Sequence, residues 1–378
     1  MTPSDLPPID PETITKLLSS LALPTPTTIT PLQVTADFHT IYLITYTSPP
    51  VSIPLPTSPD GSTLILRISG THVPHIKTMN EVAIMTWLQR HTSIPVPRII
   101  HHDTTTHNIL AREFTLLERI PGQSIDKLYP SLSEDIKMKL VDQLIDMLVE
   151  VNAHSWQHIG GLQLINGEIT PGPLLEDTFW FTPDIQKYFP GESFNTLNPL
   201  GPYSSHADFI TGYIDVFIHA MQHDSLAWMR DIIPRLDKLK AKVHELNLTS
   251  RLILAHKDLH FANIMATQDG QITGILDWEF AGIVPCVIWD PVRAFLWSGT
   301  YSQDAQEEKT RLRRIFEAQL ERRGIQKWWE EGGEDVESVW EVVRFMRAIV
   351  EVCPRGEKEE QRRTWRGSVE TALTKLGI

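Results

Sequence analysis

The spacing of hydrophobic residues divides the chain into a part that predicts strands and a part that predicts helices. Before Gly122, three runs rich in β-branched and aromatic residues favour β-strands, at 41–46, 63–68 and 114–120. One helix is predicted between the second and third runs, at 79–90, and a proline-rich stretch at 48–61 indicates a long loop. This pattern is typical of a small β-rich lobe.

After Gly122 the pattern changes to helical periodicity. Ser133 is expected to cap a helix whose apolar residues recur every fourth position, and further helices are predicted over 207–246 and from 304 onward. Residues 157–204 show only weak periodicity. A short strand is predicted at 251–255, and an Asp269-Gly270 turn predicts the hairpin that pairs 264–266 with 272–276.

A separate helix is predicted near the N-terminus, where Asp10 is a suitable N-cap and Pro11 suits the first helical position. We therefore expect an α+β fold with a helical extension, a β-rich N-lobe and a larger, mainly helical C-lobe. Their expected ranges are 1–30, 31–122 and 123–378.

Polar residues that suit proton transfer and metal binding follow the predicted strand at 251–255. Within eight positions the chain has His256, Asp258, His260 and Asn263. The following hairpin should bring Asp277 back beside Asn263. Phosphoryl transfer requires a group that receives a hydroxyl proton and oxygen ligands for Mg²⁺. The pattern predicts Asp258 as catalytic base and Asn263 and Asp277 as metal ligands; the alternative is a polar hairpin with structural hydrogen bonds.

Composition excludes several other classes of function. The 378 residues are 41% hydrophobic and 21% charged, enough for two lobes with buried cores. A formal net charge of −13 argues against nucleic-acid binding and is compatible with a cationic small substrate, although acidity also aids solubility. No run of about 18 uncharged apolar residues predicts a membrane span, and the first residues do not resemble a signal peptide. With only Cys286 and Cys353, a reducing, cytoplasmic location is the simplest interpretation.

Three segments carry a resemblance to a known family. They are Leu254–Ile264, Ile275–Ala281 and Trp289–Pro291, and together they resemble the aminoglycoside phosphotransferase family, more narrowly its large set in filamentous fungi. That family also includes choline, methylthioribose and homoserine kinases, and it shares the protein-kinase fold. The similarity extends over most of the chain, from about residue 30 to 300. It implies a protein-kinase-like two-lobe fold, ATP and Mg²⁺ as cofactors, and a hydroxyl group on a small molecule as acceptor.

The resemblance also assigns residue roles. Asp258 resembles the catalytic base, Asn263 and Asp277 resemble the metal ligands, and His260 resembles a residue that holds the loop. In the N-lobe, backbone groups around Glu118 and Ile120 would meet adenine. Glu279 either assists a metal through a water molecule or is a solvated neighbour.

One position departs from the family pattern in the predicted strand 63–68. The resemblance implies a phosphate-binding lysine there, but Arg67 occupies that point. Arginine is larger, planar and always charged, yet it can bridge a phosphate and Glu81. Glu81 has a second interpretation, because it has capping-box spacing from Thr78. We favour an ion pair between Arg67 and Glu81.

Two further departures concern the nucleotide and the catalytic loop. The phosphate loop is expected at 34–40 and contains no glycine, although backbone amides approach phosphates most easily at glycine. Lys257 replaces a small residue of the motif. Its ammonium could lower the pKa of Asp258, contact a phosphate or point to solvent.

Aromatic residues of the weakly periodic segment have two interpretations. They either form a wall for a cationic or aromatic substrate or pack in the hydrophobic core. These residues are Phe179, Trp180, Phe181, Tyr188, Phe189 and Tyr203. No activation-loop motif follows Asp277, so a protein substrate is not expected. The alternative function is a catalytically weak or inactive pseudokinase that serves as a scaffold, either nucleotide-binding or nucleotide-free, which Arg67 and the glycine-free loop motivate.

Overall fold

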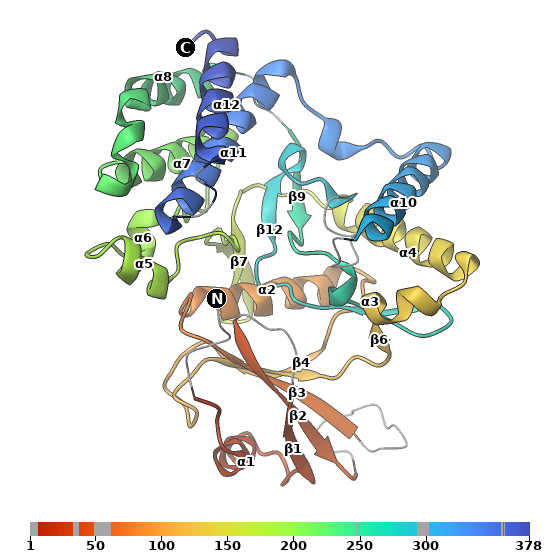
Figure 1. Ribbon diagram of the computed structural model, residues 1–378. Coiled ribbons are helices and arrows are strands. Elements are labelled where there is room, and N and C mark those ends of the chain that lie inside the picture. Colours follow the sequence, from red (N-terminus) through yellow and green to blue (C-terminus); the bar gives the residue numbers. More distant parts are fainter. Residues whose placement is uncertain are drawn as a thin grey trace.

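The computed structural model describes residues 7–32, 38–48, 62–246, 248, 250–292, 302–356, 358 and 360–378. Figure 1 shows a twisted β-sheet at one end of the molecule and a larger, mainly helical part at the other, with helix α2 between them. This arrangement is the predicted α+β architecture. The loop predicted at 48–61 lies outside the described residues from position 49 onward.

The N-terminal sheet has five antiparallel strands in the order β1-β2-β3-β5-β4. Their bounds are β1 Thr28–Pro31, β2 His39–Tyr46, β3 Ser62–Ser69, β4 Ile99–Asp103 and β5 Phe114–Glu118. The three predicted strands correspond to β2, β3 and β5. The sequence pattern does not predict β1 and β4, which form the two edges of the sheet.

Helix α1 (Pro11–Ser20) covers one face of this sheet. Asp10 caps the helix as predicted, since its carboxylate accepts a hydrogen bond from the Thr13 N–H at 2.8 Å. The buried α1 residues pack with alternate residues of β2 and β3, and this cluster includes Ile14, Leu17, Leu18, Tyr42, Ile44, Leu64 and Leu66. The alternation follows from the two-residue side-chain period of a strand.

Helix α2 (Ile76–His91) begins earlier than the predicted range of 79–90. Thr78 therefore lies inside the helix, where its hydroxyl is 3.0 Å from that of Ser69, and the capping box with Glu81 is wrong. Ten residues between Lys77 and Leu88 are buried, because α2 packs between the sheet and strand β7. A helix buried on several sides lacks the polar face that would mark its start in the sequence.

The C-terminal part contains the remaining helices. The α-helices are α3 Ile125–Leu128, α4 Glu134–Asn152, α5 Thr182–Tyr188, α6 Phe194–Leu197, α7 His206–Ala220, α8 Ile233–Val243, α10 Gln303–Arg322, α11 Glu334–Val352 and α12 Gln361–Lys375. The 3₁₀ turns are η1 Tyr129–Ser131, η2 Asp224–Ile232, η3 Phe261–Asn263, η4 Cys286–Ile288, η5 Trp328–Glu330 and η6 Cys353–Arg355. The single helix predicted over 207–246 is divided into α7, η2 and α8. Pro234 in the first turn of α8 accounts for the boundary between η2 and α8, because proline cannot continue a preceding helix.

Three small antiparallel sheets complete this part. They are β11-β10-β6, β12-β9 and β7-β8. Their bounds are β6 Gln123–Ser124, β7 Gly161–Ile165, β8 Glu168–Gly172, β9 Leu252–Ala255, β10 Ile264–Ala266, β11 Ile272–Ile275 and β12 Gly282–Pro285. Strand β9 and the β10–β11 hairpin agree with the prediction, whereas the β7–β8 hairpin lies in the segment that showed weak periodicity.

The lobe boundary expected after Gly122 stays a prediction. Strand β6 begins at the next residue and pairs with β10 of the C-terminal part. Cys286 is buried and Cys353 is half-buried. Over the described ranges, no helix combines the length and the apolar character needed to cross a membrane.

Candidate active site

The predicted catalytic loop lies between β9 and β10 and is anchored by buried apolar side chains. Leu259 and Phe261 are buried on either side of His260, and the Phe261 ring lies 5.1 Å from the Tyr129 ring. The side chain of Asp258 remains 51% exposed. The apolar residues therefore fix the loop while its carboxylate stays accessible to a ligand.

Two histidines hold the loop in this conformation. Burial lowers the pKa of His256, so its ring is neutral. Its Nε2 donates to the Leu276 carbonyl at 2.8 Å, which leaves Nδ1 to accept from the Asp258 N–H at 3.3 Å. The Nδ1 of His260 accepts from the Ala262 N–H at 3.2 Å, and its Nε2 lies 3.6 Å from the Asp258 carboxylate. Hydrogen bonding to Asp258 raises the pKa of His260.

Asn263 directly precedes β10 and Asp277 follows β11, so the two residues lie at the same end of one hairpin. The Leu276 N–H donates to the Asn263 carbonyl at 2.8 Å. The Asn263 amide nitrogen donates to the Asp258 carbonyl at 2.9 Å and faces its carboxylate at 3.3 Å. The amide oxygen is thereby turned away from the loop. Asp277 has a φ of +68°, a left-handed conformation that aspartate tolerates better than most residues.

The donor set around this hairpin fits a magnesium ion. One Asp277 oxygen accepts a hydrogen bond from Arg67, and the other accepts none from the residues that the structure describes. Asn263 offers an amide oxygen in the same way. Mg²⁺ prefers oxygen ligands and is usually bound through one or two carboxylates plus phosphates and waters. The assignment of these two residues as metal ligands stays a prediction.

Arg67 on β3 contacts two carboxylates at once. Its Nη1 donates to Glu81 on α2, and its Nη2 donates to Asp277 at 2.7 Å. Burial would lower the pKa of Arg67, but Glu81, Asp277 and Glu279 together raise it, so the guanidinium stays charged. Burial would likewise raise the pKa of Asp277, but Arg67 lowers it below its ordinary value. The predicted ion pair between Arg67 and Glu81 is confirmed.

A second buried cation, Lys77, was missed by the sequence-based prediction. Its Nζ donates to Glu279 at 2.7 Å, and the two side chains are only 1% and 4% exposed. His39 joins them, with its Nε2 3.0 Å from Lys77 Nζ and its Nδ1 3.2 Å from Arg67 Nη2 and 3.4 Å from Glu279. Burial raises the pKa of Glu279 to about 7. The interpretation of Glu279 as a solvated neighbour is wrong. The sequence signal for Lys77 was its spacing of one helical turn from Glu81, which places both side chains on the same face of the helix.

Asn80 joins α2 to the segment that follows Asp277. Its amide nitrogen donates to the carbonyls of Glu279 at 3.0 Å and Ala281 at 2.8 Å, and its oxygen accepts from the Leu162 N–H at 2.9 Å. The side chain is buried, so water cannot replace these three bonds. Asn80 therefore fixes the helix that carries Glu81 against the predicted metal-binding hairpin. A single asparagine in a helix gave no sequence signal for this role.

The predicted adenine-binding stretch lies at the end of β5. The Glu118 N–H donates to the Arg98 carbonyl at 2.9 Å, and its carboxylate pairs with the Arg98 side chain at 3.1 Å. The Glu118 N–H is therefore already used within the sheet. Among the described residues, Ile120 takes part in no backbone hydrogen bond, and its side chain packs closely on Gly274. The assignment of both positions to adenine binding stays a prediction.

Lys257 lies in a charge network that reaches the C-terminal helices. Its Nζ donates to the Leu175 carbonyl and to Glu176, both at 2.7 Å, and its side chain is 12% exposed. Glu176 lies 3.5 Å from Arg347 on α11, which also pairs with Glu351 at 3.1 Å. Lys257 does not point to solvent. It joins the catalytic loop to the segment before α5 and, through Arg347, to α11.

Two other predictions concern the phosphate loop and the aromatic residues. Positions 34–37 of the loop lie outside the described residues, and Phe38 packs edge-on against Phe181 at 5.4 Å and Phe280 at 5.3 Å. The packing interpretation is confirmed for four aromatic residues that are at most 2% exposed, Phe179, Trp180, Phe181 and Phe189. Tyr188 and Tyr203 are half-buried against the same core.

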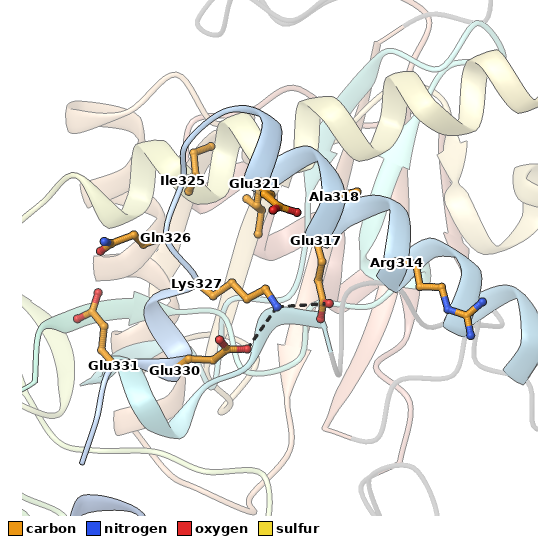
Figure 2. Close-up of a pocket in the computed structure, with 10 residues that line it drawn as sticks. Arg314, Glu317, Ala318, Glu321, Ile325, Gln326, Lys327, Glu330 and Glu331 are labelled. Atoms are coloured by element: carbon orange, nitrogen blue, oxygen red, sulfur yellow. Dashed lines mark hydrogen bonds and ion pairs between the residues drawn. The ribbon is translucent and has the colours of Figure 1, made fainter.

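A groove elsewhere on the surface lies between the end of α10 and residues 325–331 (Figure 2). Its volume is about 760 Å³, and four glutamates line it together with Arg314 and Lys327. Lys327 lies 3.4 Å from both Glu317 and Glu330, as Figure 2 shows. None of the predicted site residues lines this groove, so it is separate from the candidate active site.

Curated proteins of fungi are similar to part of the chain. The chain is 28% identical over 230 residues to clavilactone A biosynthesis cluster protein Y of Ampulloclitocybe clavipes, which covers 56% of this chain and 51% of that protein. It is 24% identical over 263 residues to a subtelomeric hrmA-associated cluster protein of Aspergillus fumigatus, with 56% and 51% covered. The chain thus spans about half the length of the curated relatives it matches.

Solved structures and a family model identify the fold and the family. The structure of aminoglycoside phosphotransferase APH(4)-Ia matches with a TM-score of 0.50 and 13% identity, covering 97% of this chain and 99% of that chain. This likeness confirms the predicted kinase-like α+β fold. The model of the phosphotransferase enzyme family, APH, matches residues 55–324, well over half of the chain. The chain therefore belongs to the phosphotransferase enzyme family.

Proposed function

We propose that the chain transfers the γ-phosphoryl group of ATP to a hydroxyl group of a small molecule. The observation that carries this proposal is the convergence of Asp258, Asn263 and Asp277 beside the Arg67–Glu81 ion pair. These residues come from the catalytic loop, the adjoining hairpin, β3 and α2. Family membership supports phosphoryl transfer to a small molecule, and the nucleotide and the residue roles are our proposal.

The proposed reaction follows from the positions of these side chains. Asp258 receives the proton of the acceptor hydroxyl, whose oxygen forms a bond to the γ-phosphorus. The bond from that phosphorus to the bridging oxygen breaks, and ADP leaves. Asn263 and Asp277 would hold Mg²⁺, which supplies positive charge against the phosphates when bound. Arg67 remains charged and, oriented by Glu81, would contact a phosphate oxygen.

The charges around Asp258 support a cationic acceptor. Asp177 is exposed, and its pKa is raised by partial loss of hydration first, then by Glu176 and Asp258, against the opposing charges of Arg347 and Lys257. Because Lys257 and Arg347 already pair with Glu176, Asp177 and Asp258 are the two carboxylates beside the catalytic loop that could face a cationic group. An acceptor that carries an ammonium group near its hydroxyl would be attracted to these two carboxylates.

The test is ATP turnover with Mg²⁺ against hydroxyl compounds supplied in pairs with and without an amino group. We expect turnover with amino-containing members and a loss of at least about a hundredfold in Asp258→Asn. Asp269→Asn is the matched control, because Asp269 lies in the turn of the neighbouring hairpin with its side chain 77% exposed. Turnover that survives Asp258→Asn would reject Asp258 as the base.

A second candidate is a scaffold that binds nucleotide without turnover. The observation that favours it is the direct hydrogen bond from Arg67 to Asp277, which occupies one oxygen of a predicted metal ligand. Thermal unfolding with ATP and Mg²⁺ separates the candidates, since a ligand at a hundred times its Kd stabilises the folded state by about 2.7 kcal/mol. Stabilisation without turnover of any acceptor would support the scaffold. No stabilisation at millimolar nucleotide would reject both candidates.

A further inference from the structure

Three metal-binding side chains converge far along the chain from the candidate active site. Glu192 lies between α5 and α6, His219 lies in the last turn of α7, and His223 directly precedes η2. The Nε2 atoms of His219 and His223 lie 2.9 Å from the two different oxygens of Glu192. All three ligand atoms lie within 4.8 Å of one another, and over the described ranges this is the one such group.

The backbone explains why the two imidazoles face the same carboxylate. His219 lies in the last turn of α7, and a hydrogen-bonded turn carries the chain from there to His223. In that turn the N–H groups of Gln222 and His223 donate to the carbonyls of His219 and Ala220, three residues back, at 3.0 and 3.1 Å. His223 itself has an extended backbone (φ −79°, ψ 149°) as the N-cap of η2. The end of α7 therefore places one ring and the following turn places the other.

The surroundings orient the third ligand as well. The Thr196 hydroxyl donates to one Glu192 oxygen at 2.6 Å, and the Phe189 ring packs edge-on against His223 at 5.0 Å. The Thr196 hydrogen bond first, and then His219 and His223, lower the pKa of Glu192 to about 2. The carboxylate is thus ionised near neutral pH, and a second set of contacts fixes its direction, as is usual around metal ligands.

We propose that Glu192, His219 and His223 form a binding site for a divalent transition-metal ion of the zinc class. Two imidazole nitrogens and one carboxylate oxygen suit Zn²⁺, Cu²⁺ or Ni²⁺, whereas Mg²⁺ and Ca²⁺ prefer oxygen ligands alone. Each neutral imidazole offers its Nε2 lone pair when its proton resides on Nδ1. Three protein ligands leave a fourth position for water.

The bound ion would join two segments that are separate in the sequence. It would link the loop before α6 to the end of α7, on the side of the helical part away from α10 (Figure 1). The side chains of His219, His223 and Glu192 are 44%, 27% and 16% exposed, so an ion can reach them from solvent. This site is independent of the proposed phosphoryl transfer, because none of its residues contributes to that reaction.

The experiment uses the untagged full chain, freed of metal with a chelator, since an added histidine tag would bind the same ions. Zn²⁺ is titrated by calorimetry in the presence of millimolar Mg²⁺, and Co²⁺ binding is followed by its visible absorption. We expect one Zn²⁺ per chain, a rise in Tm on Zn²⁺ addition, and the strong absorption of four-coordinate Co²⁺.

Substitution of each imidazole then tests the assignment. His219→Gln and His223→Gln keep a hydrogen-bond donor for Glu192 but remove the metal ligand, so we expect at least about a tenfold loss of Zn²⁺ affinity. His107→Gln is the control, because His107 is exposed in a turn of the N-terminal part and should leave binding unchanged. The Zn²⁺-dependent change in Tm is compared within each variant, so any change in metal-free stability does not affect the result. Failure to bind one Zn²⁺, or binding that both variants retain, would overturn the proposal.

Discussion

Replacing Lys257 by glycine sets two energetic effects of opposite sign against each other. Lys257 has a φ of +68°, a left-handed conformation that costs a residue with a Cβ atom about 1–2 kcal/mol. Glycine removes this strain, but it also gives the unfolded chain more conformational freedom, which lowers the free energy of unfolding by about 0.4–1 kcal/mol. The backbone alone therefore predicts a gain of about 0–1.6 kcal/mol in the free energy of unfolding.

The side chain predicts a larger loss. The ammonium donates to Leu175 and Glu176, both at 2.7 Å, and hydrogen bonds to charged groups contribute about 1.5–3 kcal/mol each. Removing one partner of a fully buried ion pair costs about 3–5 kcal/mol, but Glu176 keeps Arg347 at 3.5 Å, which places the cost near the lower end. We expect Lys257→Gly to lower the free energy of unfolding by about 2 kcal/mol.

The assay is urea unfolding of the wild type, Lys257→Gly, Glu176→Gln and the double variant. A coupling of at least about 1 kcal/mol in this double-mutant cycle would show that the ion pair, not a general loss of packing, carries the effect. Ala111→Gly is the matched control, because Ala111 has a φ of +50° and loses almost no side chain. If Lys257→Gly were stabilised as much as Ala111→Gly, the ion pair would contribute nothing and the reasoning would fail.

Three further substitutions test other contacts. Arg67→Lys should lower the free energy of unfolding by about 2 kcal/mol in urea, because one ammonium cannot pair with both Glu81 and Asp277, and an unchanged midpoint would contradict the bridge. Asn80→Leu leaves one buried N–H and two carbonyls without their partner, so we expect it to lower the free energy of unfolding by at least about 3 kcal/mol. A decrease below about 1 kcal/mol would show that water reaches these backbone groups. The pKa of Glu192 falls from 4.5 to about 2 on folding, so the folded state binds fewer protons and this stabilisation is present above about pH 4.5 and lost towards pH 2. Glu192→Gln should accordingly be less stable than the wild type at pH 7, by at most about 3 kcal/mol, and equal to it near pH 2; a difference that stays constant from pH 3 to 7 would exclude this origin.

The residues that sequence reasoning located correctly are those fixed by short-range structure. Asp258 and Asn263 lie on one loop, and the Asp269-Gly270 turn determines where Asp277 returns. Arg67 and Glu81 are distant in sequence, but each belongs to an element whose type was predicted. Their opposite charges then made an ion pair the simplest arrangement.

The residues that sequence reasoning missed depend on contacts between the two parts of the chain. Lys77 precedes the predicted helix, which begins at Met79, whereas in the structure it lies in the first turn of α2. Asn80 lay inside it, but its three partners come from segments that only the folded chain brings together. A polar residue buried in such an interface looks like any exposed helical residue in the sequence.

Short strands were missed for a related reason. Edge strands β1 and β4 have few residues, and a strand of that length is stabilised by its neighbour rather than by its own pattern. The β7–β8 hairpin did have a local signal in the sequence, the pair Asn166-Gly167. In the structure both residues have positive φ values, +52° and +85°, as a tight hairpin turn requires.

The charge balance of the buried cluster changes the meaning of the arginine in β3. Taken alone, Arg67 in place of the lysine that the resemblance implies suggests a weakened phosphate site. The structure adds the compact ammonium of Lys77 on α2, so two cations face the carboxylates of Glu81, Asp277 and Glu279, with one negative charge in excess. Burial raises the pKa of Glu279 to about 7, which is what an unbalanced buried carboxylate would show, and additional positive charge beside Asp277 would relieve it. One cation from a strand and one from a helix thus face three carboxylates, and the excess negative charge supports our proposal of a metal ion at Asp277 and Asn263.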